Sequence, residues 1–132
     1  MSKVTADMMV SLDGYAAGEG QSRERPFGDF DTDRLEAWRA HAEENAEELA
    51  AITTAGAYVM GRNMFGPDRG EWDLDWHGWW GPNPPYHAPT FVLAHRPRPS
   101  VEMEGGTVFH FATDGIEAAL ERAREAAGDK NV

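Results

Sequence analysis

The stretch of residues 57–65 constrains the fold more than any other part of the chain. An apolar run that is typical of a buried strand ends abruptly in Gly61-Arg62 and continues into a polar segment that can form a helical turn. Glycine lets a ligand approach the backbone closely, and the free N–H groups of a helical turn beside an arginine bind anions. This junction therefore predicts a phosphate site at the end of a strand.

A second strand-like run ends in the same way. Residues 90–94 are apolar, and they lead directly into His95, Arg96, Pro97 and Arg98. Ligands of open α/β sheets bind outside the carboxyl ends of neighbouring strands. We therefore expect Arg62 and Arg96 to approach one another at one sheet edge and to share one anionic ligand.

Periodicity along the rest of the chain indicates an α/β domain with a mixed or parallel sheet. Apolar and polar residues alternate near the N-terminus, and a long helix is predicted after an acidic capping box formed by Asp33 and Glu36. An alanine-rich helix ends the chain. The predicted strands lie near residues 4–12, 57–61, 90–94 and 107–112, and the predicted helices near residues 33–53 and 115–127.

Two segments have no clear period. Residues 18–31 are rich in glycine and charge and are predicted to form a mobile loop, for which a substrate-covering role is open. Residues 66–89 carry a cluster of aromatic residues, namely Trp72, Trp76, Trp79, Trp80 and Tyr86. Such a cluster forms a pocket wall or an oligomer interface, or it covers the core of its own domain.

Composition excludes several classes of function. The net charge of −11 argues against a protein that wraps nucleic acid, although it permits binding of a single nucleotide. All but two of the 12 basic residues are arginine, the residue best suited to forked phosphate contacts. The chain has no cysteine, no signal peptide and no apolar run that could span a membrane. We expect a cytoplasmic location, no metal site, and no nucleic-acid or membrane partner.

Together these motifs resemble the dihydrofolate reductase superfamily, in particular its bacterial branch related to the reductase domain of the riboflavin-pathway deaminase-reductase. The residues that carry the resemblance lie at 11–15, 59–65, 91–97 and 113–117, so it covers nearly the whole chain. It implies a three-layer α/β sandwich with a central, mostly parallel sheet and a single reductase-like domain over residues 1–132.

In that family the last helix leads into a further strand with a Gly-Gly turn and then into a closing hairpin. This chain ends at Val132, before either of them. The resemblance therefore implies a domain whose C-terminal part is missing and whose sheet edge is exposed. Two alternatives stay open: the sequence is a fragment of a longer protein, or it is a shortened relative whose cofactor site is incomplete. Unpaired edges recruit partners, so a homodimer is expected.

The resemblance implies an NADPH-dependent reductase of a small heterocyclic or nucleotide-like metabolite, similar to 5-amino-6-(5-phosphoribosylamino)uracil reductase of riboflavin biosynthesis. A 2′-phosphate needs basic groups, which favours NADPH over NADH. The deaminase half of the riboflavin enzyme would need a zinc site with cysteines, which this chain lacks. The implied cofactor-binding residues are Gly61, Arg62, Asn63, Met64, His95, Arg96 and Thr113.

The candidate catalytic residues lie at the end of the first predicted strand. Asp13 is the carboxylate expected nearest the active cleft, where it would supply a proton, and Ser11 is its hydrogen-bonding neighbour. Alternatives stay open: Asp13 only caps a turn, Arg62 forms a salt bridge to the acidic helix, and His95 is an ordinary surface residue. The alternative function is a non-catalytic nucleotide-binding or protein-interaction domain that uses the tryptophan-rich loop.

Overall fold

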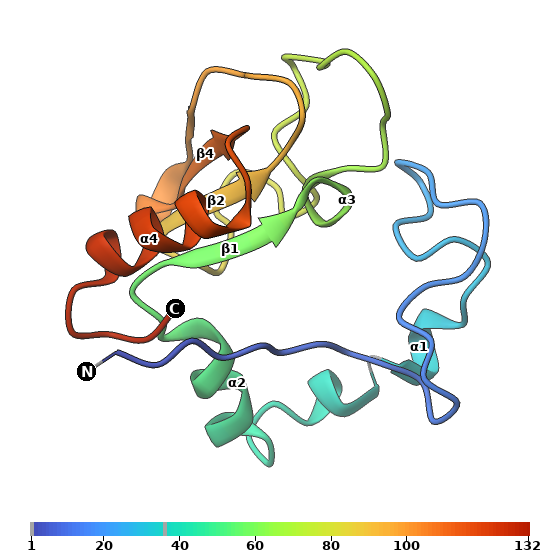
Figure 1. Ribbon diagram of the computed structural model, residues 1–132. Coiled ribbons are helices and arrows are strands. Elements are labelled where there is room, and N and C mark those ends of the chain that lie inside the picture. Colours follow the sequence, from blue (N-terminus) through green and yellow to red (C-terminus); the bar gives the residue numbers. More distant parts are fainter. Residues whose placement is uncertain (1, 36) are drawn as a thin grey trace. The chain divides into compact units, whose positions relative to one another are not determined.

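The computed structural model describes residues 2–35 and 37–132 (Figure 1). Contacts within the chain divide it into two compact units. We call residues 6–53 the N-terminal unit, and residues 54–132 together with the first five residues the C-terminal unit. The single domain predicted over residues 1–132 stays a prediction.

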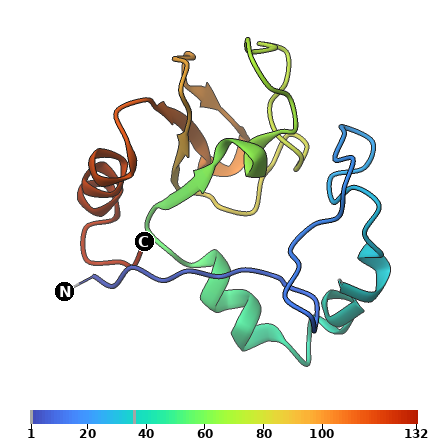
Figure 2. The same cartoon turned by 45° about the vertical axis from the view of Figure 1, so that its right-hand side comes forward.

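A four-stranded sheet forms the centre of the C-terminal unit (Figure 2). Its strands are β1 (Tyr58–Gly61), β2 (Pro89–Leu93), β3 (Val101–Glu102) and β4 (Val108–Ala112). Their order is β1-β2-β4-β3, with β1, β2 and β4 parallel and β3 antiparallel to β4. The register places Gly61 beside Leu93 and Leu93 beside Ala112, so the three parallel strands end at one edge. The predicted α/β class and the three strands expected after residue 56 are confirmed.

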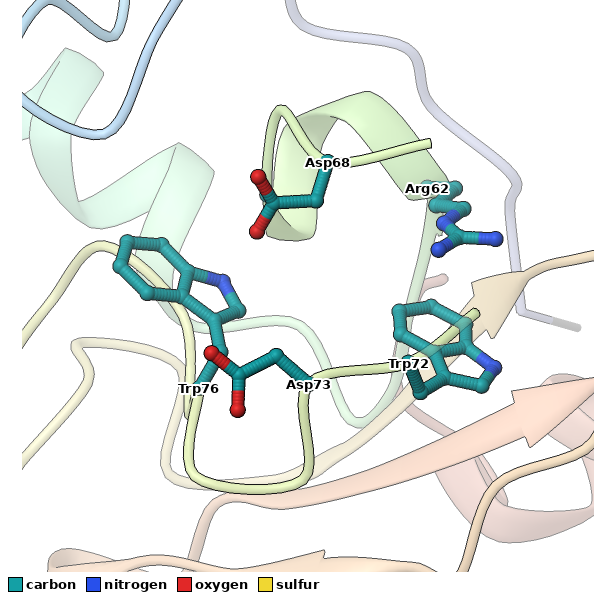
Figure 3. Close-up of a pocket in the computed structure, with 6 residues that line it drawn as sticks. Arg62, Asp68, Trp72, Asp73 and Trp76 are labelled. Carbon is teal, nitrogen blue, oxygen red and sulfur yellow. The ribbon is translucent and has the colours of Figure 1, made fainter. Parts of the chain in front are cut away.

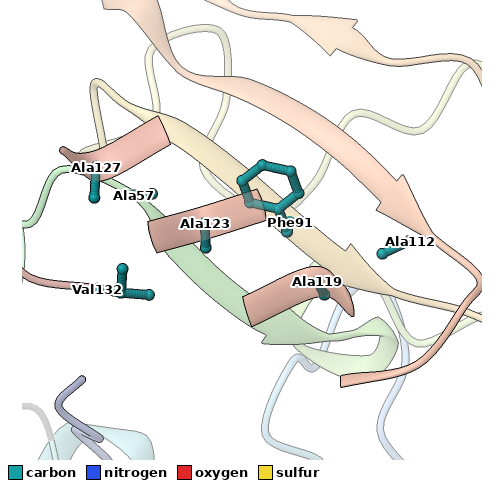
Figure 4. Packing of buried hydrophobic residues seen from close by; sticks show 7 residues of the cluster. All are labelled: Ala57, Phe91, Ala112, Ala119, Ala123, Ala127 and Val132. Atoms are coloured by element: carbon teal, nitrogen blue, oxygen red, sulfur yellow. The ribbon is translucent and has the colours of Figure 1, made fainter. Parts of the chain in front are cut away.

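Helix α4 (Ile116–Ala127) covers one face of the sheet, as Figure 4 shows. Its buried face consists of alanines that pack against Phe91 and other sheet residues. Alanine is small and favours helix, so it brings the helix backbone close to the strands. The helix begins after Gly115, whose φ of 95° suits glycine, and the predicted helix is confirmed. The buried residues of this cluster are Ala57, Phe91, Ala112, Ala119, Ala123, Ala127 and Val132.

The opposite face of the sheet lies under the tryptophan-rich loop. Here Met60, Val92 and Phe109 of the strands meet Phe65, the last residue of the short helix α3 (Arg62–Phe65). The loop, residues 66–88, contains no helix or strand among its residues, all of which are described. Its aromatic side chains Trp72, Trp76, Trp80 and Tyr86 pack on this cluster. The structure supports the interpretation of the loop as a cover for the core of its own unit.

Arg98, which follows β2, connects this loop to the sheet through hydrogen bonds. Its guanidinium donates hydrogen bonds to the backbone carbonyls of Asp73, Leu74 and Trp76, at 3.2, 3.1 and 2.6 Å. The residue is only 8% exposed, and burial lowers the pKa of the guanidinium. Arginine suits forked phosphate contacts, but Arg98 has a structural role here.

The long helix predicted at residues 33–53 is wrong. The N-terminal unit has instead α1 (Thr32–Leu35), the 3₁₀ helix η1 (Ala37–His41) and α2 (Ala46–Thr53). The break has two physical causes. The Asn45 amide donates to the carbonyls of Trp38 and His41, which competes with helical bonding, and glutamates spaced four residues apart repel one another. Of the predicted capping box, Asp33 lies in α1 and Glu36 lies outside the described residues.

The strand predicted at residues 4–12 is also wrong. All of these residues are described, and none of them is in a strand. Val4, Met8, Val10 and Leu12 are exposed, and a strand forms only where a neighbour pairs with its backbone. Pairing is confined to the first residues, where Thr5 N–H donates to the Val132 carbonyl.

The segment predicted to be a mobile loop is hydrogen-bonded within itself. Gly18 N–H donates to the carbonyl of Phe27, and Asp29 N–H donates to that of Glu19. Its mobility and its role in covering a substrate stay predictions. No helix of the described chain is long and apolar enough to cross a membrane.

Candidate functional site

A cavity of about 640 Å³ lies at the carboxyl ends of β1, β2 and β4. The sheet register explains its position, because it brings the loops after these three strands together. All of the predicted cofactor residues line the cavity except Met64, which is 52% exposed on α3. The lining residues are Gly61, Arg62, Asn63, Arg69, Gly70, Leu93, Ala94, His95, Arg96, Ala112, Thr113, Gly115 and Ile116.

Gly61 faces open space in this cavity. Its φ of −74° and ψ of 160° are ordinary extended values that any residue adopts. A Cβ atom built on Gly61 would meet no atom within 4 Å. Neither backbone strain nor packing therefore requires glycine here. A ligand that approaches the backbone closely would account for it.

Arg62, the first residue of α3, has an unusual environment. Its guanidinium carbon lies 3.8 Å from the centroid of the Trp72 ring, and Figure 3 shows the two side chains together. The Nε and Nη2 atoms are buried and have no hydrogen-bond partner in the part of the chain that the structure describes. The alternative interpretation, a salt bridge from Arg62 to the acidic helix, stays a prediction. Buried unsatisfied donors are costly, so a bound anion would stabilise the side chain.

Arg96 and His95 follow β2 on the same cavity. The Arg96 guanidinium forms an ion pair with Glu71, and both side chains are exposed. The Arg96 backbone carbonyl accepts a hydrogen bond of 2.9 Å from Trp72 Nε1. His95 is exposed, so its ring is accessible to a ligand. Arg62 and Arg96 thus line one cavity, at the ends of neighbouring parallel strands.

The N-terminus of α4 forms a third side of the cavity through Gly115 and Ile116. No side chain caps this helix, and its first backbone bond runs from Ala119 N–H to the Gly115 carbonyl. The N–H groups of the first turn are therefore left without helical partners, and they carry the positive end of the helix dipole. Together with Arg62, they make this side of the cavity suited to an anion.

Asp114, which precedes this helix, is engaged elsewhere. Arg122 donates two hydrogen bonds to its carboxylate, at 2.7 and 3.1 Å. These bonds lower the pKa of the Asp114 carboxyl, whose side chain is 53% exposed. The charge of Asp114 is thereby balanced by an arginine that does not line the cavity.

A much smaller space lies behind Arg62, between α3 and the tryptophan-rich loop (Figure 3). Its volume is about 10 Å³, which is room for one water molecule at most. It is lined by Arg62, Gly66, Asp68, Trp72, Asp73 and Trp76. A metabolite cannot enter it, so the larger cavity is the candidate ligand site.

Ser11 and Asp13 form a tight turn in the N-terminal unit. Ser11 Oγ donates to Asp13 Oδ1 at 2.5 Å and accepts from Tyr15 N–H at 2.9 Å. The expected hydrogen bond between Ser11 and Asp13 is present, and it also fits the alternative in which Asp13 stabilises a turn. Their catalytic role stays a prediction.

The described residues offer no metal site, and the cavity includes residues that the sequence motifs did not predict. No group of three or more histidine or acidic residues in the described chain could hold a metal ion. Arg69 and Gly70 line the cavity but are not among the site residues that the sequence motifs predict. They come from the irregular loop, as do Glu71 and Trp72. Only the concentration of arginine between residues 62 and 98 pointed towards Arg69.

Comparison with known families gives a match over almost the whole chain. The sequence profile of the RibD C-terminal domain matches residues 2–127. No curated protein sequence matches the chain significantly. The mixed α/β architecture agrees with the dihydrofolate reductase-like fold of the matched family, so the resemblance seen in the sequence motifs is confirmed.

Proposed function

Because the chain belongs to the RibD C-terminal domain family, a family of reductase domains of riboflavin biosynthesis, we propose that it is an NADPH-dependent reductase of a small heterocyclic or nucleotide-like metabolite. Membership implies an oxidoreductase that uses a nicotinamide cofactor. One observation carries the finer proposal. A single cavity brings together Gly61, Arg62 with its unpaired Nε and Nη2 atoms, Arg96 and the N-terminus of α4, which no side chain caps.

The residues that line the cavity fit such a cofactor. Gly61 would admit a phosphate close to the backbone, and Arg62 and Arg96 would pair with phosphate oxygens. His95 would contact the adenosine ribose or its phosphate, and Thr113 would add a hydroxyl beside the α4 terminus. The extra negative charge of a 2′-phosphate suits this basic lining, which supports NADPH over NADH.

Reduction of a carbon–oxygen or carbon–nitrogen double bond needs a hydride and a proton. The nicotinamide ring supplies the hydride when the cofactor is bound, and the protein must supply the proton. We assign the proton to Asp13, whose Oδ1 atom is held by Ser11 Oγ at 2.5 Å. Ser11 would keep the carboxyl group oriented while Asp13 gives up and regains its proton.

Titration with NADPH and with NADH, followed by tryptophan fluorescence, tests the proposal. The fluorescence of Trp72 should respond to cofactor binding because its ring lies against Arg62. We expect saturable quenching at lower concentrations of NADPH than of NADH. The change Arg62→Ala should weaken NADPH binding by about 1.5 to 3 kcal/mol through loss of a charge-assisted contact.

Arg124→Ala is the matched control, since Arg124 is exposed on α4 and does not line the cavity. An NADPH dissociation constant that is unchanged by Arg62→Ala would remove Arg62 from the cofactor site. Absence of any quenching in the wild-type chain would contradict the proposed cofactor.

The alternative is a domain that binds a nucleotide without turnover or that recruits a protein through the tryptophan-rich loop. The aromatic rings of the loop pack on the core of its own unit, so the loop offers little support for the second of these. Binding of NADPH without oxidation in the presence of a ribosylaminouracil substrate would favour the first. A cytoplasmic location and a homodimer remain proposals.

A further inference from the structure

Trp72 contacts two of the arginines that line the cavity, Arg62 and Arg96. The guanidinium of Arg62 packs over the Trp72 ring, and the indole N–H donates to the backbone carbonyl of Arg96. We propose that Trp72 is a positioning residue that sets the spacing of Arg62 and Arg96 for an anionic ligand. This inference rests on the proposed function, because the ligand used to test it is NADPH.

The contact with Arg62 is made through the ring face. At 3.8 Å from the ring centroid, the guanidinium is within cation–π range. An arginine on an aromatic face keeps its positive charge, whereas a carboxylate partner would neutralise it. Trp72 therefore orients Arg62 and leaves the charge of the side chain available to an anion.

The contact with Arg96 is made through the ring edge. The bond from Trp72 Nε1 to the Arg96 carbonyl measures 2.9 Å and joins the loop to the residues that follow β2. It fixes the backbone of Arg96, although it does not fix the side chain. One rigid side chain thus holds two residues that lie at the ends of two different strands.

Two aromatic side chains and Arg98 also pack near the Trp72 ring. The ring packs edge-on against Phe111, with centroids 5.0 Å apart, and against Phe65, at 6.1 Å. The Arg98 guanidinium, which is bonded to the loop carbonyls, lies 5.5 Å from the same ring. Trp72 does not line the 640 Å³ cavity, so it acts on the ligand only through the two arginines.

Two substitutions separate the two contacts. Trp72→Phe keeps an aromatic face under Arg62 and the packing on Phe65 and Phe111, but it removes the N–H donor. Trp72→Leu removes both. The matched controls are Trp79→Phe and Trp79→Leu, because Trp79 packs edge-on against Trp76 and lines neither cavity.

The first measurement is NADPH binding. We expect the dissociation constant to rise about fivefold in Trp72→Phe and about 20-fold or more in Trp72→Leu. If turnover is observed, KM for NADPH should rise while kcat stays near the wild-type value. Both Trp79 variants should bind as the wild type does. Equal effects at positions 72 and 79 would overturn the inference, since they would show a general loss of packing.

The second measurement needs no ligand. A guanidinium over an indole ring is shifted upfield by the ring current, so the Arg62 Hε resonance should be upfield in the wild type. The shift should be reduced in Trp72→Phe and absent in Trp72→Leu, and unaffected in the Trp79 variants. If the wild type does not bind NADPH but shows this shift, the proposed function fails and the positioning role stands. A normal Hε resonance in the wild type would overturn the positioning role itself.

Discussion

Glu71 forms an ion pair with Arg96 beside the cavity. The carboxylate occupies the arginine that would otherwise be open to a phosphate. An anionic ligand that reaches Arg96 must therefore compete with a residue of the protein itself. The two side chains are 53% and 83% exposed, so water and salt weaken the pair and the competition is modest.

Removing this competitor should tighten NADPH binding. In Glu71→Gln the Arg96 guanidinium is released, and we expect the NADPH dissociation constant to fall about two- to fivefold at low ionic strength. The gain should shrink as salt is added. Fluorescence titration at several salt concentrations measures both effects. Glu125→Gln removes the same charge from the exposed face of α4, and an equal gain there would show that only net charge matters.

The change Gly61→Ala should weaken NADPH binding without lowering the stability of the folded protein. The backbone at Gly61 is extended and no atom lies within 4 Å of a new Cβ, so unfolding should be unaffected or the protein stabilised by up to about 1 kcal/mol. NADPH binding should weaken about tenfold, or ~1.4 kcal/mol, because the methyl group enters the space of the ligand. Urea unfolding and NADPH titration of the same variant test this. A large loss of stability would mean that the fold itself requires glycine here.

His110 should make stability depend on pH. Its Nδ1 atom lies 3.0 Å from Ser100 Oγ, and its ring stacks on Phe91. Burial, and then the charge of Arg122, lower the pKa of the His110 imidazole below its ordinary value of 6.5. The unfolded chain then binds more protons than the folded chain near that pH. The contribution of neutral His110 to the free energy of unfolding is therefore complete above about pH 6.5, and it is lost as the pH falls through the pKa of the folded state.

We expect the change His110→Gln to flatten the pH dependence of the unfolding free energy between about pH 5 and about pH 7. Urea unfolding at a series of pH values measures it. His77→Gln, in the exposed part of the tryptophan-rich loop, is the control. An unchanged slope in His110→Gln would assign the pH dependence to other groups.

The edge of the sheet at β1 should promote self-association. Among the described strands, β1 pairs only with β2, so one row of its backbone groups is open to another strand. We expect the isolated 132-residue chain to dimerise or aggregate as its concentration rises. Light scattering over a concentration series decides this, and a monodisperse monomer at every concentration would contradict it.

Local patterns predicted the C-terminal unit well. The apolar runs before Gly61 and His95 became neighbouring parallel strands, and the alanine-rich helix packed where its small side chains fit. The motif residues at the strand ends were brought to one cavity because parallel strands end at the same edge. In this unit the local sequence preferences agree with the sheet topology, so local patterns were sufficient to predict the strands, the helix and the position of the cavity.

The same reasoning failed where the outcome depends on partners elsewhere in the chain. Alternation at residues 4–12 describes a strand face but cannot supply the neighbouring strand. Helical spacing at residues 33–53 was outweighed by Asn45 and by crowded glutamates. The contacts of Trp72 with Arg62 and Arg96 come from a loop without period, so no sequence pattern encodes them.

The three bonds from Arg98 to the loop carbonyls have a consequence for local opening of the protein. A loop without regular structure usually opens by itself, and its amides exchange quickly with solvent. Here a buried cation that follows β2 ties residues 73–76 to the sheet. The loop can separate from the sheet only by exposing the Arg98 guanidinium and the aromatic rings together. Loop and sheet therefore belong to one cooperative unit, and a ligand that engages Arg62 would slow hydrogen exchange in both.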